Sequence, residues 1–346
     1  MKKFLTSSKD TSLYEGYPNN NAGLDQVIEI GKLINSSEVS SSTAYSTGSV
    51  RALLSFDLPT TATVPATASY FLNLKLANAS QVKRNQGLLI YPISRSWDEG
   101  SGFFYQDVKN VNDGATWTRC NSTVSWSNAG GDFITNSTSA SVTMSAYPLG
   151  DLRIDVTNII RPIVSQSLQT TFYGLVIKFP SEDELDTMNY GNLRVFSSQT
   201  NTIFAPTLEI GWDNQTFTTG SLKPIPSLDV KIAPSNIREA YTKGEVSKVT
   251  LVVRDEYPVK AFDSVLRYKN KYYLPTSSYY SITDVQSNTT VVDFSTETKI
   301  NTDATSSYIV LDTTPLYSGR FYTLKIKVDS GDYSRILSVD SMFKVN

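Results

Sequence analysis

The amino-acid sequence predicts an all-β protein built from two β-sandwich domains. Short apolar stretches alternate with polar residues, as in 70–76 and 251–254, and this period of two is typical of half-buried strands. Turn-forming clusters rich in Asn, Asp and Gly, such as 98–102 and 128–132, separate these stretches. The chain has 346 residues, a length that favours two domains of ordinary size.

A polar stretch that ends in Pro224 and Pro226 marks the expected domain boundary, because the prolines favour an extended backbone. The last segment has the size and alternating pattern of an immunoglobulin-like domain, without the paired cysteines of antibody domains. We therefore predict a jelly-roll-like β-sandwich over residues 1–212, a linker over 213–226 and an immunoglobulin-like β-sandwich over 227–346.

Two short segments carry helix signals. Thr157 is suited to cap a turn that continues to Arg161, and Ser181 with Glu184 fits a capping box before Leu185. No apolar stripe with helical spacing continues for more than about ten residues. We therefore expect both segments to be connector turns at the margin of a sheet.

The composition excludes several kinds of chemistry. The chain has no histidine and one cysteine, Cys120, so it cannot form a Ser-His-Asp triad, a Cys-His pair or an imidazole metal site. The net charge of −2 gives no basic field for phosphates, so we expect no nucleic-acid partner. Charged residues make up 18% of the chain, below the roughly 25% typical of soluble domains. This favours rigid, weakly charged contact surfaces.

No segment has the pattern of a secretion signal or a membrane span. Residues 1–5 have a basic start, but a polar stretch follows where the apolar part of a signal peptide would begin. Nowhere do roughly 18 apolar residues follow one another. We therefore expect a protein that is made in the cytoplasm, carries no signal peptide and does not span a membrane.

The first predicted domain carries a series of short motifs in a fixed order. They comprise Asp10 and Thr11 with Tyr14, Asn20 with Gly23, 51–57, 97–100, 114–117, Trp126, 130–132, 155–157 and 205–210. Together these motifs resemble the DNRLRE-type β-sandwich module, over about residues 8–212. Such modules otherwise occur as accessories in secreted cell-surface and polysaccharide-acting proteins, so the resemblance implies no catalytic residues.

Three segments of the second predicted domain, 254–258, 272–282 and 322–328, resemble an immunoglobulin-like module of tailed-bacteriophage structural proteins. Combined with the absence of a secretion signal, the resemblance implies a non-enzymatic component of a tailed-phage virion that acts in assembly and attachment. Its place would be the capsid, neck, tail or baseplate. The implied partners are other virion proteins, and we expect a homo-oligomer in a symmetric assembly.

Two groups of aromatic residues are candidate contacts for a partner or a glycan. Aromatic rings stack on sugars and are enriched at protein interfaces, so a carbohydrate-binding or host-adhesion module is the alternative function. Packing in the core or in cross-strand pairs is the structural alternative for the same residues. The candidates are Trp97, Tyr105, Trp117 and Trp126 in the first domain, and Tyr268, Tyr272, Tyr273, Tyr279 and Tyr280 in the second.

Acidic residues in the turn clusters supply the remaining chemical alternatives. Glycoside hydrolysis needs two carboxylates and no histidine, but such acids more often cap turns, so we predict no enzyme and no catalytic residues. The oxygen-rich loops 110–114 and 128–132 are an alternative site for a structural calcium ion, without the spacing of an EF-hand. We therefore predict no cofactor. The acidic candidates are Asp98, Glu99, Asp132, Asp151 and Asp155.

Overall fold

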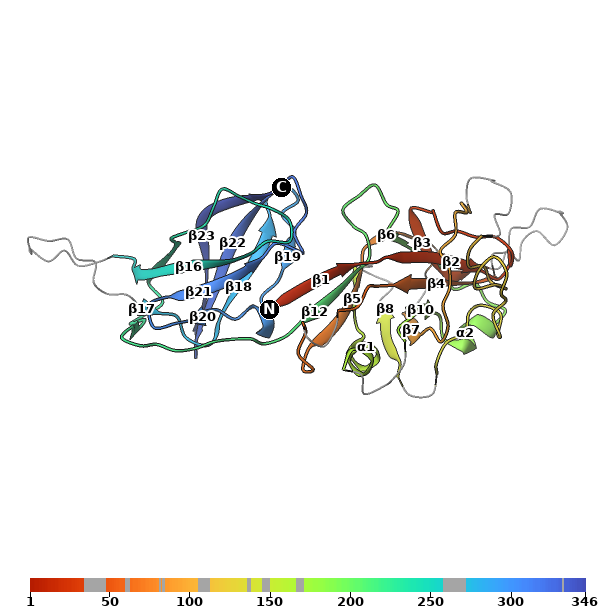
Figure 1. Ribbon diagram of the computed structural model, residues 1–346, viewed down its shortest axis with the longest axis horizontal. Helices are drawn as coiled ribbons and strands as arrows, with labels where there is room; N and C mark the ends of the chain where they lie inside the picture. The colour runs from red at the N-terminus through yellow and green to blue at the C-terminus, as the bar shows by residue number, and fades with distance from the viewer. Residues whose placement is uncertain are drawn as a thin grey trace, which may run out of the picture. The chain divides into compact units, whose positions relative to one another are not determined.

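The computed structural model confirms the all-β prediction, and the chain forms two compact units (Figure 1). The N-terminal unit is Leu5–Ile210, and the C-terminal unit combines Gly211–Asn346 with Met1–Phe4. The structure describes residues 1–33, 48–59, 63–80, 82, 85–104, 113–135, 138–144, 150–165, 171–257, 272–331 and 333–346. Within them, no helix has the length and apolar character needed to cross a membrane.

The N-terminal unit is a β-sandwich with two short helices. Its smaller sheet has the strand order β1-β12-β5-β9, and its larger sheet has the order β6-β11-β3-β4-β10-β7-β8, with β2 also paired to β4. The elements are β1 (Lys2–Thr6), β2 (Lys9–Tyr14), β3 (Val27–Leu33), β4 (Gly48–Ser55), β5 (Ser69–Leu74), β6 (Leu76–Ser80), β7 (Gln86–Pro92), β8 (Ala140–Met144), β9 (Leu152–Asp155), α1 (Thr157–Val164), β10 (Leu175–Lys178), α2 (Ser181–Leu185), β11 (Gly191–Phe196) and β12 (Thr207–Gly211).

Burial patterns show which strands are covered on both faces. Along β5 and β7, buried residues alternate with partly exposed ones, as expected where one face meets a core. All four residues of β10 are buried, and so are the last five of β2. The centre of the larger sheet therefore has a second cover on its outer face.

Both helices exist, but neither is capped as the sequence signals predict. At α1, the carboxylate of Asp155 accepts the N–H of Thr157 (2.9 Å), while the Thr157 hydroxyl accepts the N–H of Tyr70 (2.8 Å). At α2 no side chain caps the first turn, because the carboxylate of Glu184 points to ion pairs instead of back to Ser181. Local signals located these helices, but the predicted side-chain caps do not form at either of them.

The C-terminal unit has immunoglobulin-like topology, as predicted. Its sheets have the orders β14-β16-β21-β20 and β15-β23-β22-β18-β19, which match the A-B-E-D and G-F-C orders of that fold with one strand added at each edge of the second sheet. The elements are β13 (Lys223–Pro224), β14 (Val230–Pro234), β15 (Ala240–Tyr241), β16 (Val246–Asp255), β17 (Tyr272–Tyr273), β18 (Ser278–Asp284), β19 (Thr290–Val292), η1 (Thr296–Thr298), β20 (Asn301–Thr302), β21 (Ser307–Asp312), β22 (Arg320–Ser330) and β23 (Tyr333–Val345).

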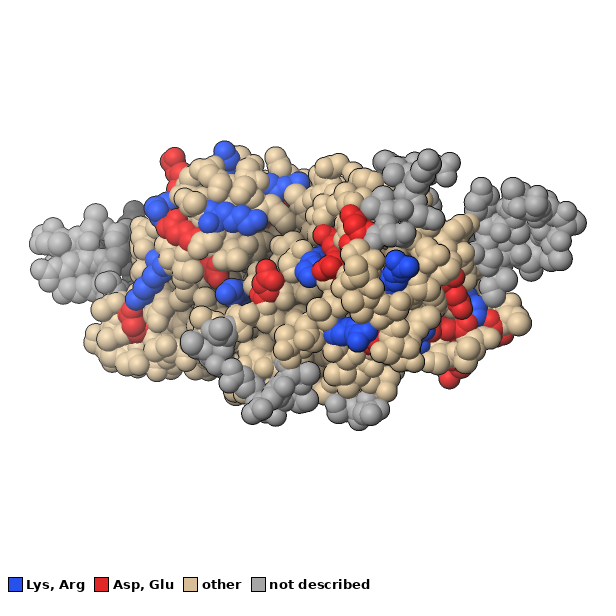
Figure 2. All heavy atoms as spheres, turned by 45° about the vertical axis from the view of Figure 1, so that its right-hand side comes forward, with Lys and Arg blue, Asp and Glu red and all other residues tan. Residues whose placement is uncertain are grey.

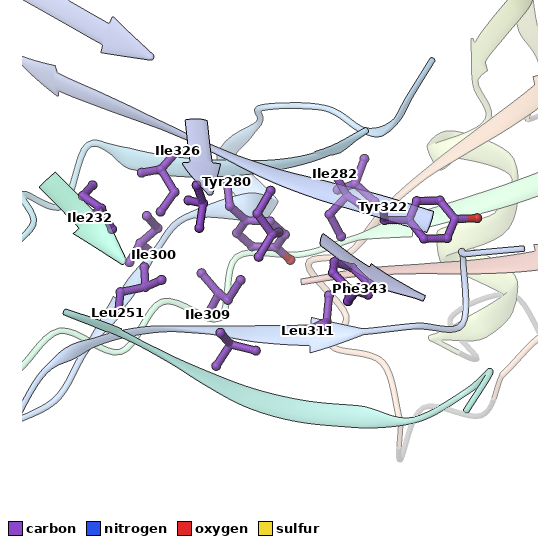
Figure 3. Packing of buried hydrophobic residues seen from close by; sticks show 14 of the residues in the cluster. Ile232, Leu251, Tyr280, Ile282, Ile300, Ile309, Leu311, Tyr322, Ile326 and Phe343 are labelled. Atoms are coloured by element: carbon purple, nitrogen blue, oxygen red, sulfur yellow. The ribbon is translucent and has the colours of Figure 1, made fainter. Parts of the chain in front are cut away.

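The core of this unit is apolar and lies between its two sheets (Figure 3). Leu251 and Ile309 of one sheet and Ile326 of the other are at most 1% exposed. Near the start of β22, the hydroxyl of Tyr322 accepts the N–H of Tyr317 (2.7 Å) and donates to its carbonyl (3.1 Å). This is the tyrosine corner that occurs at the same place in immunoglobulin-like domains.

The predicted linker differs from the structure. Residues 213–226 belong to the C-terminal unit, where the amide of Gln215 donates to the carbonyl of Ile300 (2.9 Å) and the N–H of Thr218 donates to that of Thr302 (2.9 Å). Phe4, far away in the sequence, packs against the core of the same unit. The polar composition of 213–226 reflects hydrogen bonds to the unit's surface rather than a free linker.

Candidate functional site

The outer cover of the larger sheet is an aromatic cap, formed by Ile93, Trp97, Trp117, Trp126 and Phe133. It packs on three fully buried strand residues: Leu13 of β2, Leu53 of β4 and Val176 of β10. Val176 lies opposite Leu53 in the sheet, so these two side chains share the outer face. The motif-rich loops of the N-terminal unit therefore fold back onto the sheet instead of projecting from it.

The three tryptophans of the cap are buried. Trp97, Trp117 and Trp126 are 2%, 8% and 6% exposed. The indole N–H of Trp97 donates to the carbonyl of Tyr173 (2.8 Å), and that of Trp126 donates to the carbonyl of Thr116 (2.9 Å). The expectation of an open platform for a sugar is therefore corrected to core packing, because stacking on a sugar requires an exposed ring face. Tyr105, the fourth aromatic candidate here, lies outside the described residues.

Asn21 joins its own loop to the loops that contain Glu99 and Ala115. Its amide nitrogen donates to the carbonyls of Glu99 (2.8 Å) and Ala115 (2.7 Å), and its oxygen accepts the N–H groups of Gly23 (3.1 Å) and Gly102 (2.8 Å). Only 3% of Asn21 is exposed. This one side chain uses both of its amide ends to connect three loops.

Close backbone contact explains two of the motif glycines. A Cβ on Gly23 would overlap the carbonyl oxygen of Glu99, and a Cβ on Gly114 would overlap the backbone of Gly100. Any side chain at either position would push the loops apart. Packing thus requires glycine at these two positions of the motif.

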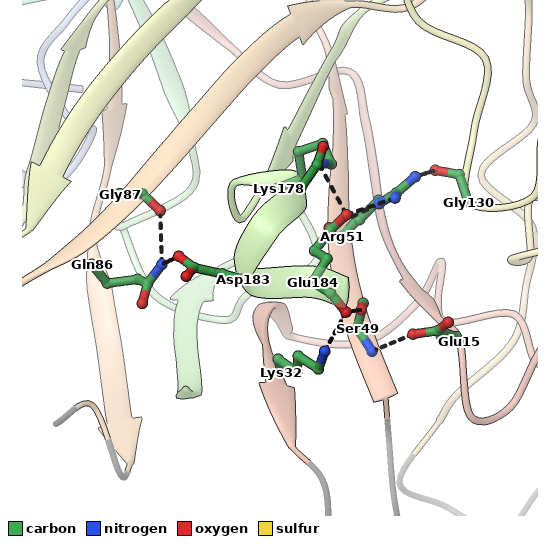
Figure 4. Close-up of polar contacts among 11 residues, drawn as sticks. Glu15, Lys32, Ser49, Arg51, Gln86, Gly87, Gly130, Lys178, Asp183 and Glu184 are labelled. Atoms are coloured by element: carbon green, nitrogen blue, oxygen red, sulfur yellow. Dashed lines mark hydrogen bonds and ion pairs between the residues drawn. The ribbon is translucent and has the colours of Figure 1, made fainter. Parts of the chain in front are cut away.

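Arg51 connects the aromatic cap to α2 (Figure 4). Its guanidinium makes a two-pronged bond to the carboxylate of Glu184, with N···O distances of 3.0 and 2.7 Å, and donates to the carbonyl of Gly130 (2.9 Å). Its Cζ also lies 4.8 Å from the ring centre of Trp117. One arginine therefore fixes a helix, a glycine turn and an indole relative to one another.

A second cation, Lys178, completes the ion cluster around Glu184. Its Nζ lies 2.9 Å from the carboxylate, and the side chains of Lys178 and Glu184 are only 2% and 7% exposed. Burial lowers the pKa of Lys178, an effect that Glu184 opposes. We call Arg51, Lys178 and Glu184 the α2 clamp.

Two further buried side chains also hold α2. The amide of Gln86 donates to the carboxylate of Asp183 (2.6 Å), and the ammonium of Lys32 donates to the carbonyls of Glu184 and Asp186 (Figure 4). The backbone of this short segment is therefore fixed at both ends. Such multiple anchoring lowers the conformational entropy that a partner would have to remove.

The same anchored segment carries two large apolar side chains that face solvent. Leu185 is 85% exposed and Met188 is 64% exposed. Glu182 is exposed beside them, and the hydroxyl of Tyr190 donates to Asp186, which lowers the pKa of that carboxyl. We call Glu182, Leu185, Asp186 and Met188 the α2 knob.

Most acidic candidates of the first domain serve turns and ion pairs. Asp132 accepts the N–H groups of Ser127 and Asn128 (both 2.8 Å); burial opposes these bonds, but they prevail and the pKa of Asp132 is lowered. Glu99 accepts the N–H of Asp10, Asp151 pairs with Lys75, and Asp155 accepts the N–H of Thr157. Asp98 is exposed. Asp132 and Asp155 thus correspond to the turn-capping interpretation, whereas Asp151 forms an ion pair.

Cys120 is buried in the cap, where its thiol donates to the carbonyl of Val124 (3.3 Å) and burial raises its pKa. In the part of the chain that the structure describes, no group of three or more Cys, Asp or Glu side chains is arranged to hold a metal ion. The loop 128–132, one of the calcium alternatives, is held by Asp132 as a hydrogen-bonded turn; residues 110–112 of the other lie outside the described residues.

The tyrosine candidates of the second unit divide by exposure. Tyr272 and Tyr280 are buried at 9% and 7%, and burial raises the pKa of Tyr280. Tyr273 and Tyr279 are half-buried; Tyr273 packs against Phe217, with ring centres 5.6 Å apart. Tyr268 lies outside the described residues. Within the described part of this group, only Tyr273 and Tyr279 retain enough exposed surface to meet a partner.

The outer face of the sheet that contains β22 and β23 is a second exposed surface. Alternate residues of a strand share a face, and the opposite face of β22 forms the core. The cross-strand pairs Phe321↔Lys344, Thr323↔Met342, Lys325↔Ser338 and Lys327↔Ile336 therefore line the outside. We give the name lysine face to Phe321, Lys325, Lys327, Ile336, Met342 and Lys344.

The α2 knob and the lysine face were both missed by the sequence reasoning. The signal for the knob was weak: Leu185 and Met188 stand alone in a polar, acidic stretch, and the capping box before Leu185 predicts only a connector turn. On the lysine face, alternating Lys and apolar residues in 321–327 suited an ordinary strand. The exposure of Phe321, Ile336 and Met342 follows only from the register between β22 and β23.

No protein-family model matches the chain, and no curated protein matches it. A solved structure of a DUF4785 family protein from Legionella pneumophila aligns over 99% of this chain and 61% of that chain, with 9% sequence identity and a TM-score of 0.20. This chain thus spans less than two thirds of that protein, and the similarity is too low to carry an argument about fold or function.

Proposed function

We propose that this protein is a non-enzymatic structural component of a tailed-phage virion, acting in assembly and attachment. One observation carries the proposal: the motif residues of the N-terminal unit build a rigid, inward-packed cap. Its indoles, its acid Asp132 and Asn21, the neighbour of the motif residue Asn20, are engaged in packing and backbone hydrogen bonds. Residues used in this way give a stiff building block suited to permanent contacts.

The character of the surface supports the same role. On the face shown in Figure 2, Lys, Arg, Asp and Glu are interspersed within a larger area of uncharged residues. Among the described residues, several charges belong to ion pairs near the surface, such as Lys75–Asp151 and Lys248–Asp303 (both 2.8 Å or less). Such surfaces carry little field to attract polyanions and favour contacts made through shape and apolar side chains.

The test is the composition of the particle. Virions from the source lysate are purified on a density gradient, and this chain is quantified by mass spectrometry against the major capsid protein. We expect a fixed ratio; a ratio that corresponds to about a dozen copies or fewer would indicate a closed ring at the neck or tail. Absence from clean particles would overturn the virion proposal and leave the carbohydrate-binding alternative, which a glycan array would then examine.

A further inference from the structure

We propose that the α2 knob of one copy of this protein docks onto the lysine face of a second copy, so that the chain associates head to tail. The inference deepens the proposed structural role by naming the contact surfaces and the partner. It can be tested on the purified protein alone, independently of any virion.

The knob has the properties of an interface anchor. Leu185 and Met188 are 85% and 64% exposed, and an exposed pair of large apolar side chains on an anchored segment gains free energy when covered. The α2 clamp and Lys32 hold the segment that carries them. Association therefore costs little ordering of the knob.

The lysine face offers an apolar surface to receive these side chains. Phe321, Ile336 and Met342 are 44%, 56% and 60% exposed on the outside of the sheet. They lie on two adjacent strands, and each is opposite or next to a lysine or threonine in the register. The face thus combines apolar side chains with a polar rim, as protein interfaces do.

Charge complementarity selects a second copy of the chain as the partner. The knob carries Glu182 and Asp186, whereas the lysine face carries Lys325, Lys327 and Lys344. Within the described residues, Lys327 pairs with Asp329 (3.1 Å), and no ion pair engages Lys325 or Lys344. Knob-to-knob or face-to-face contacts would bring like charges together, so the favoured contact joins the two different surfaces.

Two different surfaces define a heterologous contact. Each copy that binds through its knob still has a free lysine face, so association continues until a ring closes or a filament grows. A symmetric ring is one product that the proposed function allows. A two-fold pair, in which each knob meets the lysine face of the other copy, is the smallest closed form of the same contact.

The first experiment measures association of the wild-type protein by sedimentation velocity over increasing concentration. We expect association that increases with concentration, and weaker association at high salt because salt screens the opposite charges. A strictly monomeric protein up to about 1 mM, the range of the weakest specific contacts, would overturn the inference.

Variants then assign the surfaces. The knob variant is Leu185→Ser with Met188→Ser, and the face variant is Lys325→Glu with Lys344→Glu. Each is expected to weaken association at least about tenfold. The matched controls are Val246→Ser with Val252→Ser, exposed on the other sheet of the same unit, and Lys243→Glu, an exposed lysine off both surfaces. Unchanged thermal unfolding confirms that each variant is folded.

Mixing the knob variant with the face variant gives the decisive readout. Each variant alone should be monomeric, but the mixture retains one intact knob and one intact face, so we expect a 1:1 complex that cannot grow. Failure of the mixture to associate, or association lost in the valine control instead, would overturn the head-to-tail contact. Presence or absence of the protein in virions does not alter this outcome, so the two proposals fail separately.

Discussion

The two units stabilise their sheets in different ways. The C-terminal unit has an apolar core between two sheets, and among its described residues the buried charged side chains are Asp284, paired with Arg320 (2.5 Å), and Lys2. The N-terminal unit adds a loop cap to the outside of a sheet, and it buries Glu29, Lys32 and Lys178 among its charged groups.

An apolar core and a cluster of buried ion pairs differ in how precisely they orient the residues around them. An apolar core tolerates volume-conserving substitutions, but it does not by itself fix the orientation of individual surface side chains. Buried ion pairs contribute little net stability, yet they are costly to break, so they fix the one arrangement in which every partner is satisfied. The α2 knob is carried by a segment that the buried ion cluster holds, whereas the lysine face is the outer side of a regular sheet. Measurements of the unfolding of each unit can therefore separate the contribution of the ion cluster from that of the apolar core.

The largest effect is expected from Glu184→Gln. Removing the carboxylate leaves Arg51 and Lys178 buried without their counter-charge, which should lower the free energy of unfolding of the N-terminal unit by about 3–5 kcal/mol. Urea unfolding, with hydrogen exchange to assign each transition to a unit, provides the measurement. The control is Glu182→Gln on the exposed side of α2, where a change within about 0.5 kcal/mol is expected.

A double variant sharpens this prediction. Glu184→Gln combined with Lys178→Met removes the unpaired ammonium, so it should be more stable than Glu184→Gln alone. If the double variant instead loses the sum of both single effects, the clamp does not act as an ion cluster.

Asn21→Ala is expected to cost about 3 kcal/mol. The substitution leaves the carbonyls of Glu99 and Ala115 and the N–H groups of Gly23 and Gly102 without their partner in a buried place. Thermal unfolding followed by tryptophan fluorescence should report the loss, because the cap contains three tryptophans. A loss below about 1 kcal/mol would show that the loops hold together without this hub.

The sequence supported the all-β class and the immunoglobulin-like unit because alternation of apolar residues and turn chemistry are local signals. Trp97 was a candidate contact with core packing as the alternative, and its burial corresponds to the alternative. Its cover of an outer sheet face could not be predicted, since it depends on loops distant in sequence from Leu13 and Leu53. Glu184 matched a capping box in the sequence, but its carboxylate binds Arg51, which is distant in the chain, instead of capping the helix. Long-range ion pairs have no local signature.

Tyr322→Phe tests the C-terminal unit and should have a smaller effect. The variant keeps the buried ring but loses both bonds to the backbone of Tyr317, with an expected cost of about 1–3 kcal/mol. Only the unfolding transition of the C-terminal unit should move. The control is Tyr333→Phe, because Tyr333 is 74% exposed. A shift in the unfolding transition of the N-terminal unit would contradict the expectation that the two units unfold independently.

The smallest effect is a pH dependence that distinguishes the units. Burial raises the pKa of Asp10 from 3.8 to about 6, partly opposed by hydrogen bonds from Ser198 and Ser7, and burial likewise raises the pKa of Asp25 to about 6. The folded N-terminal unit therefore holds these protons more tightly than the unfolded chain. This contribution to stability is complete below pH 3.8 and is lost as the pH rises through about 6.

In the C-terminal unit the sign is reversed. Burial opposes the bonds from Arg320 and from two N–H groups, but these bonds prevail and the pKa of Asp284 is lowered. Its contribution is present above the unfolded pKa of 3.8 and is lost as the pH falls below it. Between pH 3.8 and about 6 the N-terminal unit should thus lose stability while this carboxyl leaves the C-terminal unit unchanged.

The variant Asp10→Asn isolates the effect, because asparagine keeps the shape of the side chain and does not ionise in this range. Urea unfolding at about pH 4 and about pH 6.5 should show that the wild-type N-terminal unit weakens by on the order of 1–2 kcal/mol relative to the variant as the pH rises. An equal pH dependence in the two proteins would mean that Asp10 is ionised with its ordinary pKa in the folded state. The surroundings of Asp10 would then be better hydrated than its burial indicates. The two units would differ less in how they bury polar groups than the structure suggests.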